Sequence, residues 1–418
     1  MRVEYMLALR TARSDRSSRA SVMMRIAALS VAIGIGVMVV TLAVIGGFRY
    51  AIHTDLRGFA ADVEVVDVTS QSGNDGDPVS FDEDFFASLQ SLPEVEWVGL
   101  YANCGGMAKA GDNVCGLHLK GVGADYDLSW WQTKLVGGAM PQLGGEERQK
   151  EILLSQATAR LLGLEVGDKL EMLFMGNGER PRRDRFKISG LYNTGFEEMD
   201  RVTALVDIRD VQRLSSWQSH QISGYDIRLN SAVQSAAVAE HIEDMIFEAY
   251  DEGNEDMASL TATTLAERNP VVFDWLKAHD VNATVIIVIM MVVLLLNMTS
   301  AMLIMVLDRT GMIGLLKAQG MRNGAVRRIF LWRAALLFLK GAAWGNGIAL
   351  LLVGVQWLWQ PVKLDPAGYM LSVLPVRVEL WWLLLLNAGV LASTLLMMLV
   401  PSLIVARIHP DQTLKYKQ

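Results

Sequence analysis

Four long apolar blocks divide the chain, within residues 24–48, 281–307, 334–359 and 379–405. Crossing roughly 30 Å of hydrocarbon takes about 20 apolar residues in a helix, and each block is long enough. The pattern therefore predicts four transmembrane helices. The first block is too long for the apolar region of a signal peptide, and no A-x-A site follows it directly. We expect it to remain in place as a membrane helix.

Between the first two blocks, residues 49–280 show the shorter patterns of a soluble domain. Alternating apolar and polar positions predict strands, for example at 94–102 and 107–110. Ser155 precedes a helical pattern as an N-cap and Gly163 follows it as a C-cap, which predicts a helix between them. The expected fold class is a membrane protein with four transmembrane helices and a large α/β extracytoplasmic domain between helices 1 and 2.

Shorter segments flank or connect the blocks. Residues 1–23 carry apolar side chains among arginines, which predicts an amphipathic helix along the inner membrane surface. Residues 360–378 form a loop that contains three prolines, and residues 406–418 form a short tail.

The segment 308–333 predicts a short amphipathic helix between the second and third spans. Its apolar residues recur at helical spacing: Met312, Ile313, Leu315 and Leu316. Gly320 is placed to end this helix in a left-handed C-cap, and Asn323 is placed as the N-cap of the next helix. The segment is therefore interpreted as a short helix on the positively charged side of a membrane, where a partner protein can bind it.

Charge is distributed unevenly along the chain, although its net value is only −7. Residues 1–25, 308–333 and 406–418 together hold 15 basic and 4 acidic residues, whereas residues 49–280 hold 20 basic and 39 acidic ones. Lys and Arg near the ends of spans favour the cytoplasmic side. This distribution predicts that both termini and the segment 308–333 are cytoplasmic, and that the acidic domain and the loop 360–378 lie outside.

The chain has two cysteines, Cys104 and Cys115, both in the predicted outer domain. They flank a predicted hairpin with residues 110–113 at its tip. A two-residue turn at Gly111 and Asp112 would not place the cysteines opposite one another. An oxidising compartment would permit a disulfide, so a bridge and two half-buried thiols are both open.

Motifs for catalysis or nucleotide binding are absent from the sequence. There is no G-x-x-x-x-G-K-[ST] loop, no H-E-x-x-H and no G-x-S-x-G. The histidines have no metal-ligand spacing. Glu197, Glu198 and Asp200 follow a glycine and are interpreted as a solvated loop. The sequence predicts no catalytic residue, no metal site and no cofactor in this chain.

Polar and small residues inside the spans are better candidates for function, because polar groups are costly in lipid. Asn297 and Asn387 are placed to hydrogen-bond between helices. Lys340 lies about two turns inside the third span, where reaching back to the cytoplasmic headgroups and pairing within a helix bundle are both open. Gly341 and Gly345 form a G-x-x-x-G pattern that lets another helix approach closely. Ordinary helix packing is the simpler interpretation of these residues.

Five stretches, in this order along the chain, carry a resemblance to a known family. They are RIAALSVAIGIGVMVVTLAVIGGF at 25–48, LLSQATARLLGLEVGDKLEML at 153–173, FKISGLYNTGFEEMD at 186–200, RTGMIGLLKAQGMRNGAVRRIFLW at 309–332 and PSLIVARIHPDQTLKY at 401–416. Together they resemble the permease subunits of the MacB-type ABC transporter superfamily, and most of all the LolC/LolE lipoprotein-releasing permeases. The resemblance covers nearly the whole chain.

The resemblance implies a non-catalytic permease of the bacterial inner membrane. Two copies of a separate ATPase subunit would bind ATP and Mg, and a second permease copy or a paralogue would complete the dimer. The substrate would be a lipoprotein, passed on to a periplasmic carrier, with no nucleic acid involved. ATP hydrolysis would move the periplasmic domain by mechanotransmission.

The resemblance also assigns residues that would contact the ATPase. They are Ile313, Gly314, Leu316, Lys317, Gly320 and Met321. Many relatives have an acidic residue where this chain has Met312, so a polar contact at that position is not expected here. A MacB-like efflux permease for peptides or antibiotics and an FtsX-like signalling scaffold are the alternative functions.

Overall fold

The computed structural model describes residues 19–72, 77–145, 147–174 and 182–399. Most of the predicted amphipathic helix at 1–23, the end of the fourth span and the predicted tail at 406–418 lie outside the described residues. The chain divides into two compact units. We call residues 1–50, 275–362 and 374–418 the membrane unit, and residues 51–274 with 363–373 the soluble unit.

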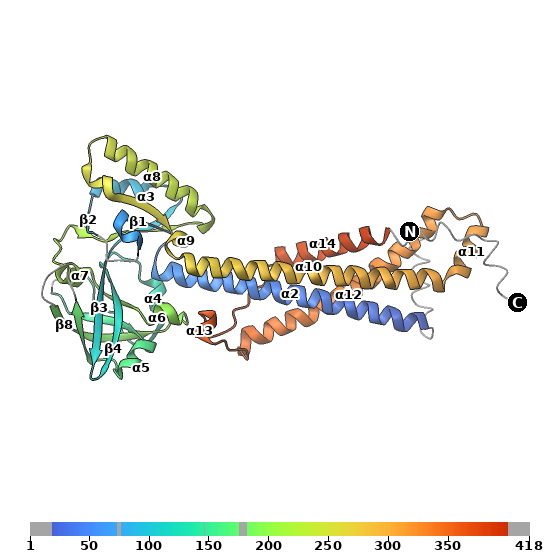
Figure 1. Cartoon of the computed structure of the whole chain (residues 1–418), viewed down its shortest axis with the longest axis horizontal. Helices are drawn as coiled ribbons and strands as arrows, with labels where there is room; N and C mark the ends of the chain where they lie inside the picture. The colour runs from blue at the N-terminus through green and yellow to red at the C-terminus, as the bar shows by residue number, and fades with distance from the viewer. Residues whose placement is uncertain (1–18, 73–76, 146, 175–181, 400–418) are drawn as a thin grey trace. The chain divides into compact units, whose positions relative to one another are not determined.

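Long helices dominate the membrane unit, and Figure 1 shows them running side by side. The helices are α2 (Arg19–Phe59), α10 (Pro270–Asp308), α11 (Thr310–Ala318), α12 (Asn323–Trp359) and α14 (Leu380–Met397). Among the described residues, four of them, α2, α10, α12 and α14, are long and apolar enough to cross a membrane. The prediction of four membrane helices is thereby confirmed.

Three of these helices extend past the apolar blocks that predicted them. Beyond the apolar block that ends at Phe48, α2 continues to Phe59, and Phe48, Ile52, Leu56 and Phe59 are all buried. These positions recur at helical spacing, so the helix continues with one buried face after its all-apolar part ends. In the same way α10 begins at Pro270 and α12 begins at Asn323, both before their apolar blocks.

The core of the membrane unit is built from apolar side chains of α2, α10, α11 and α12, with Val390 and Met398 from the last span. Its most buried members include Val31, Ile35, Met298, Ile313, Val326, Phe330 and Phe338. The short helix α11 therefore packs on the same core as the spans.

Strands and short helices make up the soluble unit. The strands are β1 (Val63–Asp67), β2 (Val79–Ser80), β3 (Val95–Ala110), β4 (Asn113–Val122), β5 (Leu135–Gly138), β6 (Glu151–Ser155), β7 (Lys169–Phe174), β8 (Arg182–Tyr192), β9 (Thr203–Asp207), β10 (Gln221–Ile222), β11 (Gly224–Leu229) and β12 (Leu260–Thr264). The helices are η1 (Val68–Ser72), α3 (Glu83–Ser91), α4 (Ser129–Thr133), α5 (Gln156–Leu162), α6 (Glu197–Asp200), α7 (Ile208–Leu214), η2 (Ala232–Gln234), α8 (Ser235–Asp251), η3 (Glu255–Ser259), α9 (Leu265–Arg268) and α13 (Pro366–Tyr369).

Ten of the described strands form one mixed sheet in the order β12-β1-β11-β3-β4-β9-β6-β8-β5, with β7 paired to both β3 and β8. A two-residue turn joins β3 to β4, because Ala110 pairs with Asn113. β3 is continuous over Val95–Ala110, so the prediction of two strands at 94–102 and 107–110 was wrong. Pairing with β11, β4 and β7 along its length keeps β3 extended through its two central glycines.

The sheet carries two separate hydrophobic clusters. One lies between α5, α7 and the strands β3, β4, β6, β7, β8 and β9, and the other lies between α3, α8 and the strands β1, β11 and β12. The helices that cover the sheet are short, and caps at their ends stabilise them. Ser155 accepts a hydrogen bond from the backbone of α5, Gly163 ends that helix in the left-handed region, and Asp207 caps α7.

Candidate functional site

The helix α11 lies between the second and third spans and ends in a Schellman motif. Gly320 has a φ of +88°, its N–H bonds to the Lys317 carbonyl at 2.9 Å, and the Met321 N–H bonds to the Leu316 carbonyl at 3.0 Å. The predicted left-handed cap at Gly320 is confirmed. The predicted N-cap at Asn323 was wrong by one position, because Arg322 has the extended cap conformation and Asn323 is the first residue of α12.

One face of α11 is covered by the chain itself. Ile313 is fully buried on the core of the membrane unit, next to residues of α12, and Gly314 is buried as well. Leu315 points the other way and is 54% exposed. Of the other residues expected to contact an ATPase, Leu316, Lys317 and Met321 are half-buried and Gly320 is exposed. Contact with an ATPase stays a prediction, and Leu315 is the large apolar side chain of α11 that is exposed in this structure.

Asparagine side chains join the membrane helices in pairs. Asn297 on α10 donates to the Ser30 hydroxyl on α2 at 3.0 Å. Asn346 on α12 and Asn387 on α14 exchange two hydrogen bonds, at 2.9 and 3.1 Å. Two amides that satisfy one another avoid the cost of unpaired polar groups in lipid. Of these residues, sequence analysis assigned this role to Asn297 and Asn387 only.

Gly341 and Gly345 lie where α12 crosses α2. A Cβ at Gly341 would come within 2.7 Å of the Val31 side chain, and one at Gly345 within 2.5 Å of the Ala32 carbonyl oxygen. Both distances are too short for real side chains, so the two helices depend on glycine at these positions to pack this closely. Lys340, one residue earlier, is exposed on the membrane unit.

A group of buried charges lies in the soluble unit, where α2 ends and β1 and α9 begin. Asp62 connects three elements there. Its carboxylate pairs with Arg57 of α2 at 2.8 Å and accepts from the Leu229 backbone N–H at the end of β11, also at 2.8 Å. Its carbonyl accepts from the Leu265 N–H, the first residue of α9, at 3.0 Å. We call this group and the pairs described next the joint.

Lys120 holds the last residue of α2 from the middle of the sheet. Its Nζ donates to the Phe59 carbonyl at 2.7 Å and to the Asp226 carboxylate at 2.6 Å. The Tyr126 hydroxyl donates to the same carboxylate. The Asp226 side chain is fully buried and that of Lys120 is 8% exposed. The ammonium group thus satisfies a helix-end carbonyl and a buried carboxylate together.

Glu64 and Arg268 form a third ion pair of the joint, at 2.9 Å, between β1 and α9, in which the glutamate is buried and the arginine half-buried. The Tyr101 hydroxyl donates to the same glutamate at 3.2 Å. Burial raises the pKa of Glu64, and the Arg268 guanidinium opposes that rise. Burial and the nearby Glu64 charge raise the pKa of Tyr101 well above its usual value, so Tyr101 remains a hydrogen-bond donor.

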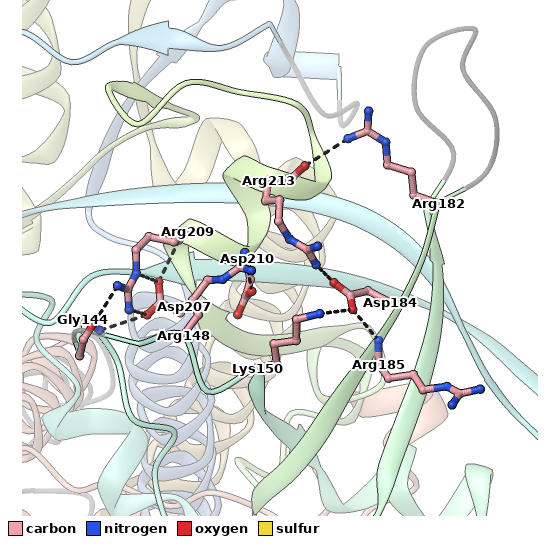
Figure 2. Close-up of polar contacts among 11 residues, drawn as sticks. Gly144, Arg148, Lys150, Arg182, Asp184, Arg185, Asp207, Arg209, Asp210 and Arg213 are labelled. Carbon is pink, nitrogen blue, oxygen red and sulfur yellow. Dashed lines mark hydrogen bonds and ion pairs between the residues drawn. The ribbon is translucent and has the colours of Figure 1, made fainter.

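A cluster with more basic than acidic residues surrounds α7 and β8 (Figure 2). Asp184 pairs with Arg213 and, at 2.7 Å, with Lys150. The other close contacts are Arg148 with Asp210 at 3.3 Å, Arg209 with Asp207 at 2.6 Å, and the Gly144 N–H with Asp207 at 3.1 Å. We call these residues, with Arg182 and Arg185, the cationic cluster.

Electrostatics in the cationic cluster are dominated by the basic side chains. Burial lowers the pKa of Lys150, and the guanidinium groups of Arg213 and Arg148 lower it further. The side chains of Arg185 and its neighbour Arg183 are about 70% exposed, and both pair with Glu171, at 3.3 and 3.9 Å. The cluster therefore presents positive charge to solvent on a domain whose sequence is acidic overall.

Several sequence predictions about reactive groups are answered in the soluble unit. Cys104 and Cys115 are not joined by a disulfide, and the register places Cys115 opposite Ala108. The interpretation of Asp200 as solvated was wrong, because it is 3% exposed and accepts from the Thr194 N–H at 3.1 Å and the Thr194 hydroxyl at 2.7 Å. Within the described ranges, no cluster of three or more His, Cys, Asp or Glu could hold a metal ion.

Sequence analysis did not single out the joint. Its charged residues lie inside stretches that alternate in the way typical of half-buried strands, yet β1 is buried on both faces. A charged residue in a central strand can be recognised as part of a buried ion pair only when its partner is known. Lys120 and Asp226 are 106 positions apart, so the sequence alone gives no reason to pair them.

Family models match both parts of the chain. The model described as MacB-like periplasmic core domain matches residues 25–245, and the model described as FtsX-like permease C-terminal matches residues 284–410. The first match covers the first span and most of the soluble unit, and the second covers most of the remaining spans.

Curated relatives match over nearly the full length. "Lipoprotein-releasing system transmembrane protein LolC" of Xylella fastidiosa (strain Temecula1) is 22% identical over 404 residues, which are 93% of this chain and 92% of the relative. "Lipoprotein-releasing system transmembrane protein LolE" of Haemophilus influenzae is 21% identical over 408 residues, 93% of each chain. LolC of the same organism is 22% identical over 434 residues, 99% of each chain.

Solved structures with weak similarity include two transporter domains. The extracellular domain of the noncanonic ABC-type transporter YknZ from Gram-positive bacteria is 14% identical, with a TM-score of 0.32, over 48% of this chain and 99% of that one. The periplasmic region of MacB from Actinobacillus actinomycetemcomitans is 12% identical, with a TM-score of 0.33, over 52% and 95%. The family relationship rests on the sequence matches.

Proposed function

The chain belongs to the family of the MacB-like periplasmic core domain, and from that premise we propose that it is the permease subunit of an ABC transporter that releases lipoproteins from the bacterial inner membrane. One observation carries the proposal: relatives described as lipoprotein-releasing proteins match this chain from end to end, through both the soluble unit and the spans. Both termini and α11 are cytoplasmic in this proposal, and the soluble unit is periplasmic.

The proposed mechanism is mechanotransmission. Two copies of a separate ATPase subunit bind and hydrolyse ATP with Mg, and this chain contributes no catalytic group. A second copy of the chain or a paralogue completes the permease pair. Movement begins at α11 and passes through the long helices to the soluble unit, which lifts the lipoprotein from the outer leaflet. The joint supports this mechanism, because it fixes the end of α2 and the start of α9 to the sheet by ion pairs whose carboxylates are buried.

The lipoprotein would leave to a periplasmic carrier. The cationic cluster supports a carrier with an acidic docking face, because its basic side chains outnumber its acidic ones even though Glu171 pairs with Arg183 and Arg185, and net positive charge attracts carboxylates and speeds association. Arg185→Glu should weaken carrier binding, and binding should also fall as salt is raised. The matched control is Arg160→Glu, an exposed arginine on α5 outside the cluster. Equal binding by both variants would exclude the cluster as the docking surface.

Release is tested in liposomes that contain the permease, its co-purified ATPase and a lipid-anchored reporter protein. ATP should transfer the reporter to the soluble fraction, and an unlipidated reporter should show no ATP dependence. Retention of the lipidated reporter by an active ATPase complex would exclude lipoprotein release. Protection of cells against peptides or antibiotics would then favour an efflux permease.

Contact of α11 with the ATPase is tested by Leu315→Glu. This side chain is exposed, so the change should leave the fold intact while placing a charge in an apolar contact, which is costly. We expect loss of ATPase in co-purification. Asn323→Asp is the control, because it adds a negative charge at the favourable N-terminus of α12. Normal ATPase recovery with Leu315→Glu would exclude docking through this face.

A further inference from the structure

The loop between the last two spans folds into a hairpin that belongs partly to each unit. Residues 363–373 are part of the soluble unit, whereas residues up to 362 and from 374 are part of the membrane unit. Lys363 and Val373 pair as an antiparallel bridge, and the Leu364 N–H donates to the Ser372 carbonyl at 3.0 Å. We call residues 362–374 the strap.

At its base, the strap is clamped to the membrane unit by one buried glutamine. The Gln356 side chain, near the end of α12, donates to the carbonyls of Val362 and Leu374, each at 3.1 Å. Its oxygen accepts from the Val362 N–H at 3.1 Å. A single amide therefore holds both limbs of the hairpin. Just beyond the strap, the Arg377 N–H donates to the Ala43 carbonyl of α2 at 2.9 Å, which fixes the chain before α14 begins.

At its tip, the strap is anchored within the soluble unit. Leu371 pairs with Phe196 as an antiparallel bridge, and their exposed fractions are only 6% and 1%. The loop that carries Phe196 is also held by hydrogen bonds that do not involve the strap. The Thr194 N–H and hydroxyl both donate to the Asp200 carboxylate. The Thr158 hydroxyl of α5 donates to the Asp200 and Arg201 carbonyls, at 3.3 and 3.1 Å.

We propose that the strap is a second mechanical connection, through which α12 and α14 are coupled to the soluble unit in addition to the chain connections made by α2 and α10. This inference rests on the proposed mechanotransmission and adds the route by which the last two spans take part. The strap remains docked through the cycle, because both of its ends are held by buried contacts. Its load passes from Gln356, through the paired limbs, to Leu371 and Phe196.

The test introduces a disulfide, which can be formed and reduced, at the contact between Phe196 and Leu371. Phe196→Cys/Leu371→Cys is introduced in a Cys104→Ala/Cys115→Ser parent, in the complex with its ATPase. Paired residues of an antiparallel bridge lie about 4.5–5.5 Å apart at Cα, which suits a disulfide. Reduction leaves two small thiols in place of the apolar contact, and oxidation restores a covalent link. The control pair is Ala110→Cys/Asn113→Cys, which crosslinks the β3–β4 hairpin away from the strap.

Two measurements distinguish a failure of the strap proposal from a failure of the proposed lipoprotein substrate. Hydrogen exchange of α5 and α6 is compared with and without ATP trapped on the ATPase, and release of a lipid-anchored reporter is followed in liposomes. In the reduced variant, we expect both the exchange response and release to fall about tenfold, within the usual range for coupled sites. Oxidation should restore both responses. The control pair should show no dependence on oxidation.

Every other result counts against the strap proposal, the lipoprotein-release proposal, or both. Equal responses in the reduced and oxidised variant would overturn the strap, as would failure of the disulfide to form. A parent that shows the exchange response but releases no lipoprotein would overturn the proposed cargo and leave the strap standing. A parent without any exchange response would overturn both ideas. Should the double variant fail to fold, Gln356→Leu, which removes the clamp at the base, must show the same loss, and normal responses in it would overturn the proposal.

Discussion

Replacing Lys120 by methionine tests the joint most directly. The change keeps the length of the side chain but removes the ion pair with Asp226 at 2.6 Å and the hydrogen bond to the Phe59 carbonyl at 2.7 Å. It leaves a carboxylate with no exposed surface without its cation. Removing one partner of a buried pair costs about 3–5 kcal/mol of unfolding free energy. We expect Lys120→Met to lie in that range.

Removing both charges should largely restore stability. In Lys120→Met/Asp226→Leu both charges of this pair are removed, and replacing a buried ion pair by apolar side chains is often neutral. The Tyr126 hydroxyl loses its acceptor, which costs about 1 kcal/mol. The double variant should therefore be more stable than the single variant, although each change alone removes a native contact.

Thermal unfolding of the full-length protein in detergent measures these differences. Trp130 and Trp131 pack on Phe59, with ring centroids 5.2 and 5.3 Å away, so tryptophan fluorescence reports on the joint. At about 2–4 °C per kcal/mol for a unit of this size, Lys120→Met should lower Tm by roughly 6–20 °C. The control is Lys109→Met at an exposed position of β3, with an expected change within about 0.5 kcal/mol. A Tm for Lys120→Met equal to the control, or a double variant less stable than the single one, would refute the reasoning.

Three further predictions concern helix packing and acid stability. Gly345→Ala should destabilise the membrane unit by about 1–3 kcal/mol, because its Cβ would meet the α2 backbone, whereas Gly347→Ala, with no heavy atom within 4 Å, should be neutral in the same detergent unfolding assay. Asn387→Leu should cost only about 0.6 kcal/mol, the average for a hydrogen bond between membrane helices, and a cost several times larger would contradict the assignment. Burial alone would raise the pKa of Asp207, but hydrogen bonds to its carboxylate outweigh burial and lower it, so its contribution is present above about pH 4 and is lost as pH falls through the lowered value. Asp207→Asn should remove that part of the acid unfolding profile, and an unchanged profile would contradict it.

The helices were predictable because their signals are local. An apolar block of about 20 residues has few alternatives to a membrane helix, and the caps at Ser155, Gly163 and Gly320 depend only on neighbouring residues. The extension of α2 to Phe59 is also visible in the sequence, as apolar positions that continue at helical spacing. Sequence analysis ended the span at Phe48 because it followed the all-apolar pattern, and that pattern changes there to a one-sided one.

The contacts of the joint and the strap were not predictable, because they join distant positions. Whether Asp226 faces Lys120 depends on the register of β11, β3 and β4, and one residue of slip would turn every side chain to the other face. The same holds for Leu371, which lies in a loop with no periodic pattern and pairs with Phe196, a residue far from it in sequence. For α11, the sequence predicted the helix correctly but could not distinguish the buried Ile313 from the exposed Leu315.

The charged residues of the joint should affect transport separately from their effect on stability. Apolar contacts are non-directional, so they specify the angle of a helix end less tightly than hydrogen bonds do. Hydrogen bonds weaken steeply when their angle changes, so Lys120 and Asp226 fix the direction in which α2 leaves the sheet. Lys120→Met/Asp226→Leu should therefore regain Tm but remain about tenfold slower in ATP-driven release from liposomes, within the usual range for coupled sites. Recovery of both stability and release in the double variant would show that the ion pair contributes to stability alone. In that case α2 would transmit movement without a direction fixed by hydrogen bonds.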